Sequence, residues 1–146
     1  MTITTNAIND QGYIISRFTC DGENINPRLA FAGVPENAKS LALIIDDPDA
    51  PVGTFTHWTL YNIPSTTIQI DEGILPTGAK QGINSFGRIS YGGPCPPAGS
   101  AHRYYFKLYA LDNINDLSNG VEIQELIETI NNHTIEKCEI FGKYKK

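Results

Sequence analysis

The segment 39–46, KSLALIID, constrains the fold more than any other part of the sequence. Nearly every residue in it is apolar, which is typical of a strand that is buried on both of its faces. Such a strand has to lie inside a sheet that other elements cover on either side. Charged and stiff residues follow at once, because the chain continues as DPDAP over residues 47–51. The sequence therefore predicts a central strand that ends in a rigid, polar turn.

Four other segments are predicted to be strands. Segment 28–35 is a short extended piece, while segments 54–64 and 101–112 are dense in Thr, Trp, Tyr, Phe and Ile, which favour a pleated surface. Segment 133–144 alternates polar and apolar residues, although imperfectly. Many strands with little helix predict a mostly β fold, a β-sandwich of two antiparallel sheets with one or two short helices.

One helix and one long loop complete the predicted architecture. A single apolar stripe at i, i+3, i+4 and i+7 predicts the helix, and it consists of Ile123, Leu126, Ile127 and Ile130. Asn119, followed three residues later by Glu122, is expected to form a capping box at its start. Residues 65–101 are full of Gly and Pro. A loop of this length inside a compact domain is usually functional or disordered.

Length and charge restrict the class of protein. The 146 residues suit a single domain, 1–146, with one core. A net charge of −5 without a basic stripe argues against a nucleic-acid partner. No segment approaches the ~18 apolar residues of a membrane span, and the first ten residues lack the basic start and apolar run of a signal peptide. The sequence therefore predicts a cytoplasmic protein without a membrane span.

The three cysteines, Cys20, Cys95 and Cys138, show no pairing motif. An odd number without such a motif argues against a disulfide framework. We therefore expect reduced thiols, as is usual in a cytosol.

The DPDAP turn carries the first candidate site residues. Pro48 and Pro51 restrict the backbone and hold Asp47 and Asp49 in one shape. Such a turn can organise side chains for binding in advance. The alternative, taken from this segment alone, is a stiff turn in contact with solvent.

Two histidines follow on the predicted strands. His57 is expected to share a strand face with Phe55, Thr59 and Tyr61, because alternate residues of a strand point to the same side. His102 opens the segment 101–112, and Tyr104 shares its face. Each histidine by itself could equally be a core residue with a satisfied hydrogen bond.

The loop 91–99, YGGPCPPAG, is rigid and poor in backbone donors. From residue 93 to 97, only Gly93 and Cys95 carry an N–H group, because the other three residues are prolines. A rigid loop that presents one or two free N–H groups can cradle an anion. The alternative is a Pro-rich surface loop.

Taken together, these segments match a known family in their order along the chain and in the identity of their residues. The blocks DDPDAP, THW, LYNIP, FGRI, YGGPCPP and HRYYFKLYALD resemble the phosphatidylethanolamine-binding protein family, in its prokaryotic branch related to the Raf kinase inhibitor proteins. FTCDGENINP and the terminal KCEIFGKY also look like that branch, so the resemblance covers nearly the whole chain. The sequence departs from the family in NPRLAF and in the short loop at 98–101, which does not favour a large head group.

The resemblance implies a β-sandwich with a small, accessible pocket for phosphate, acetate or phosphorylated head groups. By motif match, the anion-binding residues are Asp47, Asp49, His57, Gly93, Cys95, His102 and Tyr104. Kinase inhibition by eukaryotic relatives implies that the protein regulates a partner protein, such as a kinase or a protease. The protein itself is expected to be a monomer or a homodimer. The resemblance implies no cofactor.

These residues suggest how an anion would be bound. The two imidazoles and a few N–H groups would donate to its oxygens in charge-assisted hydrogen bonds. The aspartates would accept from the imidazoles, which fixes their tautomers and raises their pKa. We therefore expect anion affinity to weaken as pH rises past the histidine pKa. We also expect the protein to be a binding protein rather than an enzyme.

Three alternatives stay open at this point. Asp–His pairs beside an anion pocket could act as general bases in a hydrolase, with Tyr104 or a water taking part, although no nucleophile motif is present. His57, His102, Asp47 and Cys95 are ligand types that zinc accepts, but no close ligand pair anchors such a site. The last alternative is a purely structural role.

Overall fold

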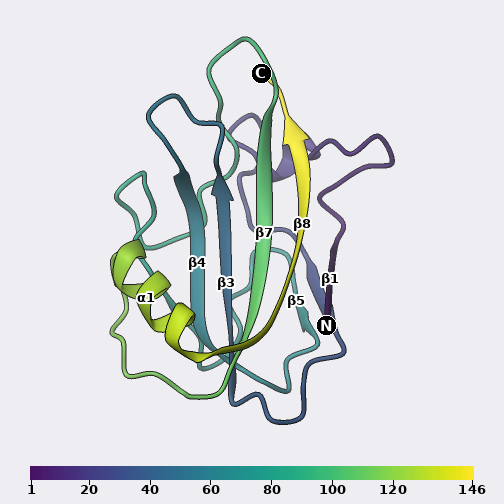
Figure 1. Cartoon of the computed structure of the whole chain (residues 1–146). Coiled ribbons are helices and arrows are strands. Elements are labelled where there is room, and N and C mark those ends of the chain that lie inside the picture. Colours follow the sequence, from purple (N-terminus) through teal and green to yellow (C-terminus); the bar gives the residue numbers. More distant parts are fainter.

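The computed structural model describes residues 1–146 and consists of two antiparallel sheets packed face to face (Figure 1). The five-stranded sheet has the order β6-β4-β3-β7-β8 and the three-stranded sheet the order β1-β2-β5. The elements are β1 (Thr2–Thr5), the 3₁₀-helix η1 (Ser16–Phe18), β2 (Leu29–Ala32), β3 (Ser40–Asp47), β4 (Phe55–Pro64), β5 (Gln69–Ile70), β6 (Lys80–Gln81), β7 (His102–Leu111), α1 (Ile123–His133) and β8 (Thr134–Tyr144). The predicted mostly β sandwich is confirmed.

Strand β3 is the centre of the large sheet, between β4 and β7. All eight of its residues are buried. Leu43 and Ile45 belong to the main core between the two sheets, whereas Ala42 and Ile44 belong to a second cluster under α1. A strand with apolar neighbours on both faces has no place for alternating polar residues, which explains the apolar run from Leu41 to Ile45.

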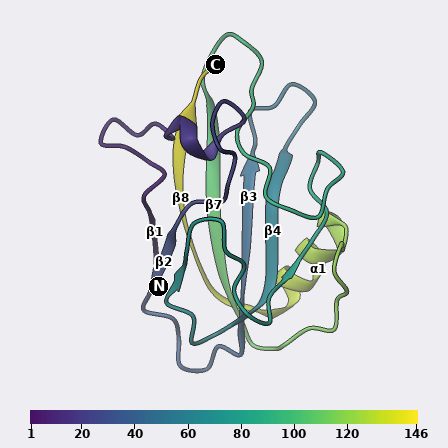
Figure 2. The ribbon, with the colours of Figure 1, turned by 180° about the vertical axis from the view of Figure 1, so that it is seen from behind.

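The main core fills the space between the two sheets. Figure 2 shows the two sheets from behind. The large sheet contributes side chains such as Trp58, Leu60, Phe106 and Leu108, and β2 contributes Leu29 and Phe31. Burial of one such side chain stabilises the fold by about 1.5–3 kcal/mol. This core fixes the ends of β3, β4 and β7 relative to one another.

Helix α1 covers the outer face of the large sheet through Leu126 and Ile130. Ile127, which the predicted stripe included, is 41 % exposed. The predicted capping box is wrong: Glu122 is the N-cap residue without a side-chain cap, and Asn119 instead accepts a hydrogen bond from the backbone N–H of Gln81. With 11 residues, α1 is too short and too polar to cross a membrane.

The cysteines differ from the prediction. Cys20, just after η1, forms a disulfide with Cys95 of the Pro-rich loop, and only Cys138 is free. The two cysteines are 75 residues apart in sequence. Backbone contacts bring them together, because the N–H of Cys20 donates to the carbonyl of Pro94 at 3.1 Å. Residue spacing alone could not predict this pairing, since it depends on how the long loop folds back onto η1.

Candidate functional site

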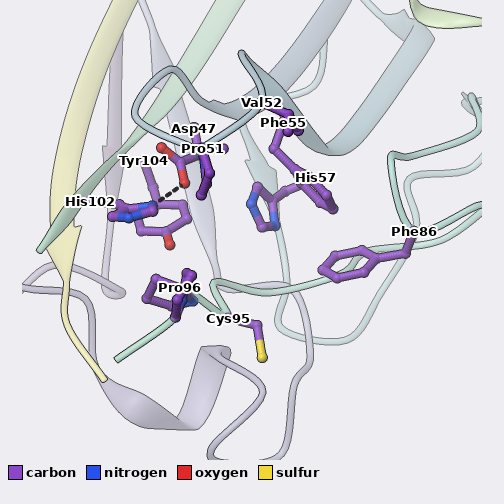
Figure 3. Close-up of a pocket in the computed structure, with 12 residues that line it drawn as sticks. Asp47, Pro51, Val52, Phe55, His57, Phe86, Cys95, Pro96, His102 and Tyr104 are labelled. Atoms are coloured by element: carbon purple, nitrogen blue, oxygen red, sulfur yellow. Dashed lines mark hydrogen bonds and ion pairs between the residues drawn. The ribbon is translucent and has the colours of Figure 1, made fainter. Parts of the chain in front are cut away.

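A pocket of about 330 Å³ opens where β3 ends and where β4 and β7 begin. These ends meet at one edge of the sheet because β4 and β7 both pair antiparallel with β3. The Pro-rich loop closes the opposite side (Figure 3). The residues that line the pocket are Asp47, Ala50, Pro51, Val52, Phe55, His57, Phe86, Cys95, Pro96, Pro97, His102 and Tyr104.

A β-bulge directs His57 into this pocket. In the pairing of β3 with β4, Ile45 lies opposite Trp58 and Asp46 lies opposite Thr56, so that His57 is the extra residue. Bulges re-aim side chains in this way. The His57 ring lies 5.2 Å from that of Tyr104 and 4.9 Å from that of Phe55, measured between centroids.

The bulge also corrects the predicted strand face. Tyr61 belongs to the cluster under α1, whereas the Tyr104 that His57 contacts belongs to the main core. Thr59 likewise faces the α1 side, where its hydroxyl accepts from the N–H of Gly82. Strict alternation along β4 therefore fails at His57, because one residue too many stands between the paired positions.

Hydrogen bonding fixes the tautomer of His57. Its Nδ1 is 2.7 Å from the carbonyl oxygen of Gly92, and a carbonyl can only accept, so Nδ1 carries the hydrogen. Nε2 is then the ring nitrogen available to the pocket. His57 is only 3 % exposed, and burial lowers the pKa of its imidazole. The expected rise in pKa is therefore wrong for His57, because burial lowers its pKa by more than the hydrogen bond to Gly92 and the attraction of Asp47 raise it.

His102 has the same tautomer but a different partner. Its Nδ1 is 2.7 Å from Oδ2 of Asp47, whose other oxygen accepts from the backbone N–H of Asp49 at 2.7 Å. Asp47 is 3 % exposed. When protonated, His102 forms an ion pair with this buried carboxylate. The aspartate–imidazole contact expected from the sequence is present here, and Figure 3 marks it with a dashed line.

Asp49 lies outside the pocket and supports the turn. Its carboxylate accepts three hydrogen bonds from Arg103, from the backbone N–H, Nε and Nη2, at 2.8–2.9 Å. These bonds lower the pKa of Asp49 to about 2. Asp49 therefore ties the DPDAP turn to β7 and contacts neither imidazole.

The Pro-rich loop contributes less backbone to the pocket than the sequence suggests. The N–H of Gly93 donates to Oδ1 of Asn24 at 2.8 Å, and Gly93 does not line the pocket. A Cβ at this position would lie 2.3 Å from the carbonyl oxygen of Phe18, so the close approach requires glycine. Cys95 does line the pocket, and its N–H donates to no protein acceptor.

Tyr104 places an unpartnered hydroxyl at the site. The residue is 1 % exposed, and its buried oxygen has no hydrogen-bond partner. Burial raises the pKa of this phenol, so the hydroxyl remains a donor at neutral pH. A buried hydroxyl without a partner costs about 1–3 kcal/mol. Such a group at the wall of a pocket is typical of a contact that a ligand completes.

Sequence reasoning missed most of the apolar wall. Phe86 comes from the long loop and packs edge-on against Phe55 at 4.8 Å. Pro51 and Val52 form the turn above the pocket, and Val52 is 96 % exposed. The only signal for Phe86 was its position in the block FGRI; nothing in the local pattern shows that this loop returns to β4.

The structure does not assemble a metal site from the candidate ligands. No three His, Cys, Asp or Glu side chains lie close enough together to hold a metal ion. Cys95, one of the four candidate ligands, is oxidised in the disulfide and offers no thiolate.

A β-sandwich with this pocket at the edge of its central strands defines a class of binding protein. The chain belongs to the phosphatidylethanolamine-binding protein family, whose model matches residues 4–145. This finding confirms the resemblance that the sequence motifs indicated.

Individual relatives resemble the chain over nearly its whole length. A UPF0098 protein of Methanothermobacter thermautotrophicus is 47 % identical, with 100 % of this chain and 99 % of the relative covered. The crystal structure of a phosphatidylethanolamine-binding protein homologue from Chlamydia trachomatis superposes with a TM-score of 0.92 at 39 % identity, and 99 % and 96 % of the two chains are covered. YbcL of Escherichia coli, described as a member of the mammalian family, gives 0.92 at 34 % identity, with 99 % and 98 % covered.

Proposed function

We propose that the protein is a non-catalytic binding protein whose pocket holds a small anionic or phosphorylated ligand. The observation that carries this proposal is the buried, unpartnered hydroxyl of Tyr104 in a pocket that His57 and His102 also line. Three polar groups from two strands converge there, although His57 is 45 residues before His102 in the sequence. A buried donor without an acceptor is best explained by an acceptor that the ligand supplies.

Three donors are available to such an anion. Tyr104 offers its hydroxyl, Cys95 offers its free N–H, and His102 offers Nε2–H when it is protonated. A protonated His102 would make a charge-assisted hydrogen bond, which is roughly twice as strong as a neutral one. Asp47 would hold His102 in place rather than touch the anion, since two negative charges repel.

The apolar wall indicates what the anionic group is attached to. Phe55, Phe86 and Val52 surround the pocket mouth, so a small aromatic or aliphatic body beside the anionic group would bury apolar surface. The exposed rim at Val52 and Phe86 would also be part of any surface that a kinase or protease partner contacts. Regulation of such a partner by an occupied pocket is the second part of the proposal.

Ligand binding can be tested with phenyl phosphate by calorimetry and thermal shift. A ligand that binds only the folded state stabilises it by RT ln(1 + [L]/Kd). We expect Tyr104→Phe to bind phenyl phosphate about tenfold more weakly, which corresponds to one lost hydrogen bond. The same variant should be as stable as the wild type, or up to about 1 kcal/mol more stable, because it removes an unsatisfied buried group.

The control for this test is Tyr109→Phe, because Tyr109 is a half-buried tyrosine of the same strand outside the pocket. Its affinity for phenyl phosphate should stay at the wild-type value. Absence of binding by phenyl phosphate, inorganic phosphate and acetate to the wild type would overturn the proposal.

A hydrolase is the second candidate, favoured by the Asp47–His102 hydrogen bond of 2.7 Å. This pair has the geometry of an oriented general base. Turnover of phenyl phosphate or phenyl acetate that disappears in His102→Gln, but not in the surface variant His133→Gln, would support it. Turnover that both variants retain would dismiss it.

We also propose that the protein is located in the cytoplasm. Stable disulfides occur mainly in oxidising compartments, and among intracellular proteins they are common in hyperthermophiles. Thiol labelling of the protein directly in cell extracts, combined with fractionation, tests the location and the oxidation state of Cys20 and Cys95 together.

A further inference from the structure

The Cys20–Cys95 disulfide lies at the wall of the pocket, where solvent reaches it. Cys95 is exposed and lines the pocket, and both cysteines line a neighbouring hollow of about 250 Å³. In Figure 3 the sulfur of Cys95 points away from His57 and His102. Exposed disulfides are more easily reduced than those inside a core, and they are more often regulatory. The position of this bridge therefore leaves it open to a thiol from solution.

The ammonium group of Lys146 lies beside the bridge. Its Nζ is 3.6 Å from the sulfur of Cys20 and 3.6 Å from that of Cys95, and it also pairs with Asp21 at 3.6 Å. An uncharged disulfide gains little from a nearby cation. When the bridge opens, however, the departing sulfur carries a negative charge, and a neighbouring ammonium stabilises that thiolate. Lys146 thus lies where it favours opening of the bridge.

The disulfide is the last anchor of the Pro-rich loop before β7 begins. Three hydrogen bonds tie residues 91–94 to the segment around η1, and they join Tyr91 to Phe18, Gly93 to Asn24, and Cys20 to Pro94. The backbone of residues 95–101 makes no hydrogen bond. Beyond Pro94, the path of the loop towards β7 is therefore held by the bridge and by side-chain packing alone.

Opening of the bridge would release one wall of the pocket. Segment 95–101 would gain conformational entropy, since no backbone hydrogen bond fixes its path. The N–H of Cys95, one of the donors proposed for the anion, would lose its fixed position, and Pro96 beside it also lines the pocket. The pair of His102 and Asp47 on the strand side does not depend on the bridge. Reduction would therefore weaken the pocket and leave the sandwich in place.

We propose that the Cys20–Cys95 bridge is a redox site at which a dithiol sets the affinity of the pocket: the oxidised protein binds the anionic ligand, and the reduced protein releases it. The inference rests on the proposed function of the pocket and adds a control of its occupancy. Disulfides in the cytosol of mesophilic organisms are usually transient, and they are catalytic or redox-sensing. A bridge that opens and closes is compatible with the proposed location in the cytoplasm.

The exchange uses the two electrons of one dithiol. A thiolate of the dithiol attacks Sγ of the exposed Cys95, the S–S bond breaks, and the sulfur of Cys20 leaves as a thiolate beside Lys146. The second thiol of the reductant then displaces the sulfur of Cys95 from the mixed disulfide. The dithiol ends as a disulfide, and the two cysteines end as thiols with the two protons that it gave up.

The test measures the affinity of phenyl phosphate for both redox states by calorimetry. Cys138→Ser serves as the reference protein, because it leaves Cys20 and Cys95 as the only cysteines. We expect reduction by dithiothreitol to weaken binding at least about tenfold, as the loss of one hydrogen-bond donor does, and re-oxidation to restore it. NMR signals of His102 should stay in place, which shows that the reduced protein is still folded.

A pair of lysine variants tests the ammonium group. In Lys146→Gln, thiol labelling should show that dithiothreitol opens the bridge at least about threefold more slowly, because the departing thiolate is no longer stabilised. Lys145→Gln is the matched control at the neighbouring exposed lysine, and its bridge should open at the wild-type rate. Both variants should bind phenyl phosphate with unchanged affinity while the bridge is intact. Equal opening rates would overturn the role of Lys146.

The outcomes separate the inference from the proposed function. If both redox states bind phenyl phosphate within about threefold of each other, the inference is overturned and the proposed function stands. If the His102 signals collapse on reduction, the loss of affinity reflects unfolding, which also overturns the inference. If the oxidised protein binds neither phenyl phosphate, inorganic phosphate nor acetate, the proposed function is overturned together with the inference.

Discussion

The two sides of the pocket are held by different kinds of structure. On one side His102 lies on β7, and its partner Asp47 is the last residue of the neighbouring strand β3. On the other side His57 lies on a bulge of β4, and its partner Gly92 belongs to a loop that the Cys20–Cys95 disulfide anchors. Both partners accept from Nδ1 at the same distance, but one is a carboxylate and the other a carbonyl. The hydrogen bond therefore fixes the tautomer on both sides, and on the loop side burial also lowers the pKa of His57.

Loss of the disulfide is expected to have the largest effect, and it should affect the loop side alone. Because the bridge closes a loop of 75 residues, Cys20→Ser with Cys95→Ser should lower the free energy of unfolding by about 4 kcal/mol. Chemical denaturation measures this loss. The ring signals of His57 should shift in NMR spectra, while those of His102 should stay in place.

The control is Cys138→Ser, which removes the free, half-buried thiol of β8 and leaves the bridge intact. It should cost clearly less than the double variant. An equal loss in the control would mean that the disulfide does not stabilise the loop side.

Removal of the buried charge on the strand side should have the next largest effect. Asp47→Asn keeps the shape of a side chain that accepts from His102 and from the N–H of Asp49, but it removes the carboxylate. We expect a loss of about 2 kcal/mol in the free energy of unfolding and about tenfold in the affinity for phenyl phosphate, because His102 loses its ion-pair partner.

Asp112→Asn is a matched control, since Asp112 accepts from the exposed His133 at 2.8 Å far from the pocket. Its effect should stay within about 0.5 kcal/mol, with unchanged affinity. Equal effects of the two substitutions would show that burial of the strand-side pair does not matter.

Titration of His57 is the smallest perturbation, because it changes no residue. Its pKa in the folded protein is lowered, so the unfolded chain binds more protons below pH 6.5. Stability should therefore be constant above this pH and fall as the solution is acidified towards the folded-state pKa. His57→Gln should remove that part of the pH dependence. An NMR titration in which His57 takes up its proton at or above pH 6.5 would contradict the assigned neutral state.

The sequence predicted the large sheet well because its signals are local. The apolar run at β3, the aromatic residues of β4 and β7 and the alternation in β8 each reflect which faces of a strand are buried. The same reasoning failed at His57. This residue is the extra one in a β-bulge, and a bulge is defined by the pairing of β4 with β3 rather than by the sequence of β4 alone. The reasoning also failed at Asn119, which a hydrogen bond to Gln81 takes away from the helix start.

The candidate site divides in the same way. His102, Tyr104 and Asp47 lie at strand ends that the motifs identified, and all three line the pocket. Gly93 and Asp49 come from the same motifs but support the pocket from outside it, through Asn24 and Arg103. The sequence motifs mark residues that lie near the pocket. They do not distinguish a residue that lines the pocket from one that supports it through a hydrogen bond outside.

The sequence by itself determined the sandwich and its central strand. Residue types and their spacing are enough for this, because burial and backbone preference act over a few residues. The set of polar residues expected at one edge came from the resemblance of the motifs to a known family. Only the tertiary structure decided the Cys20–Cys95 pairing, the return of Phe86 to β4 and the partner of each imidazole. Those features depend on contacts between segments tens of residues apart, and the proton that an imidazole carries depends on whichever oxygen the fold places 2.7 Å from its Nδ1.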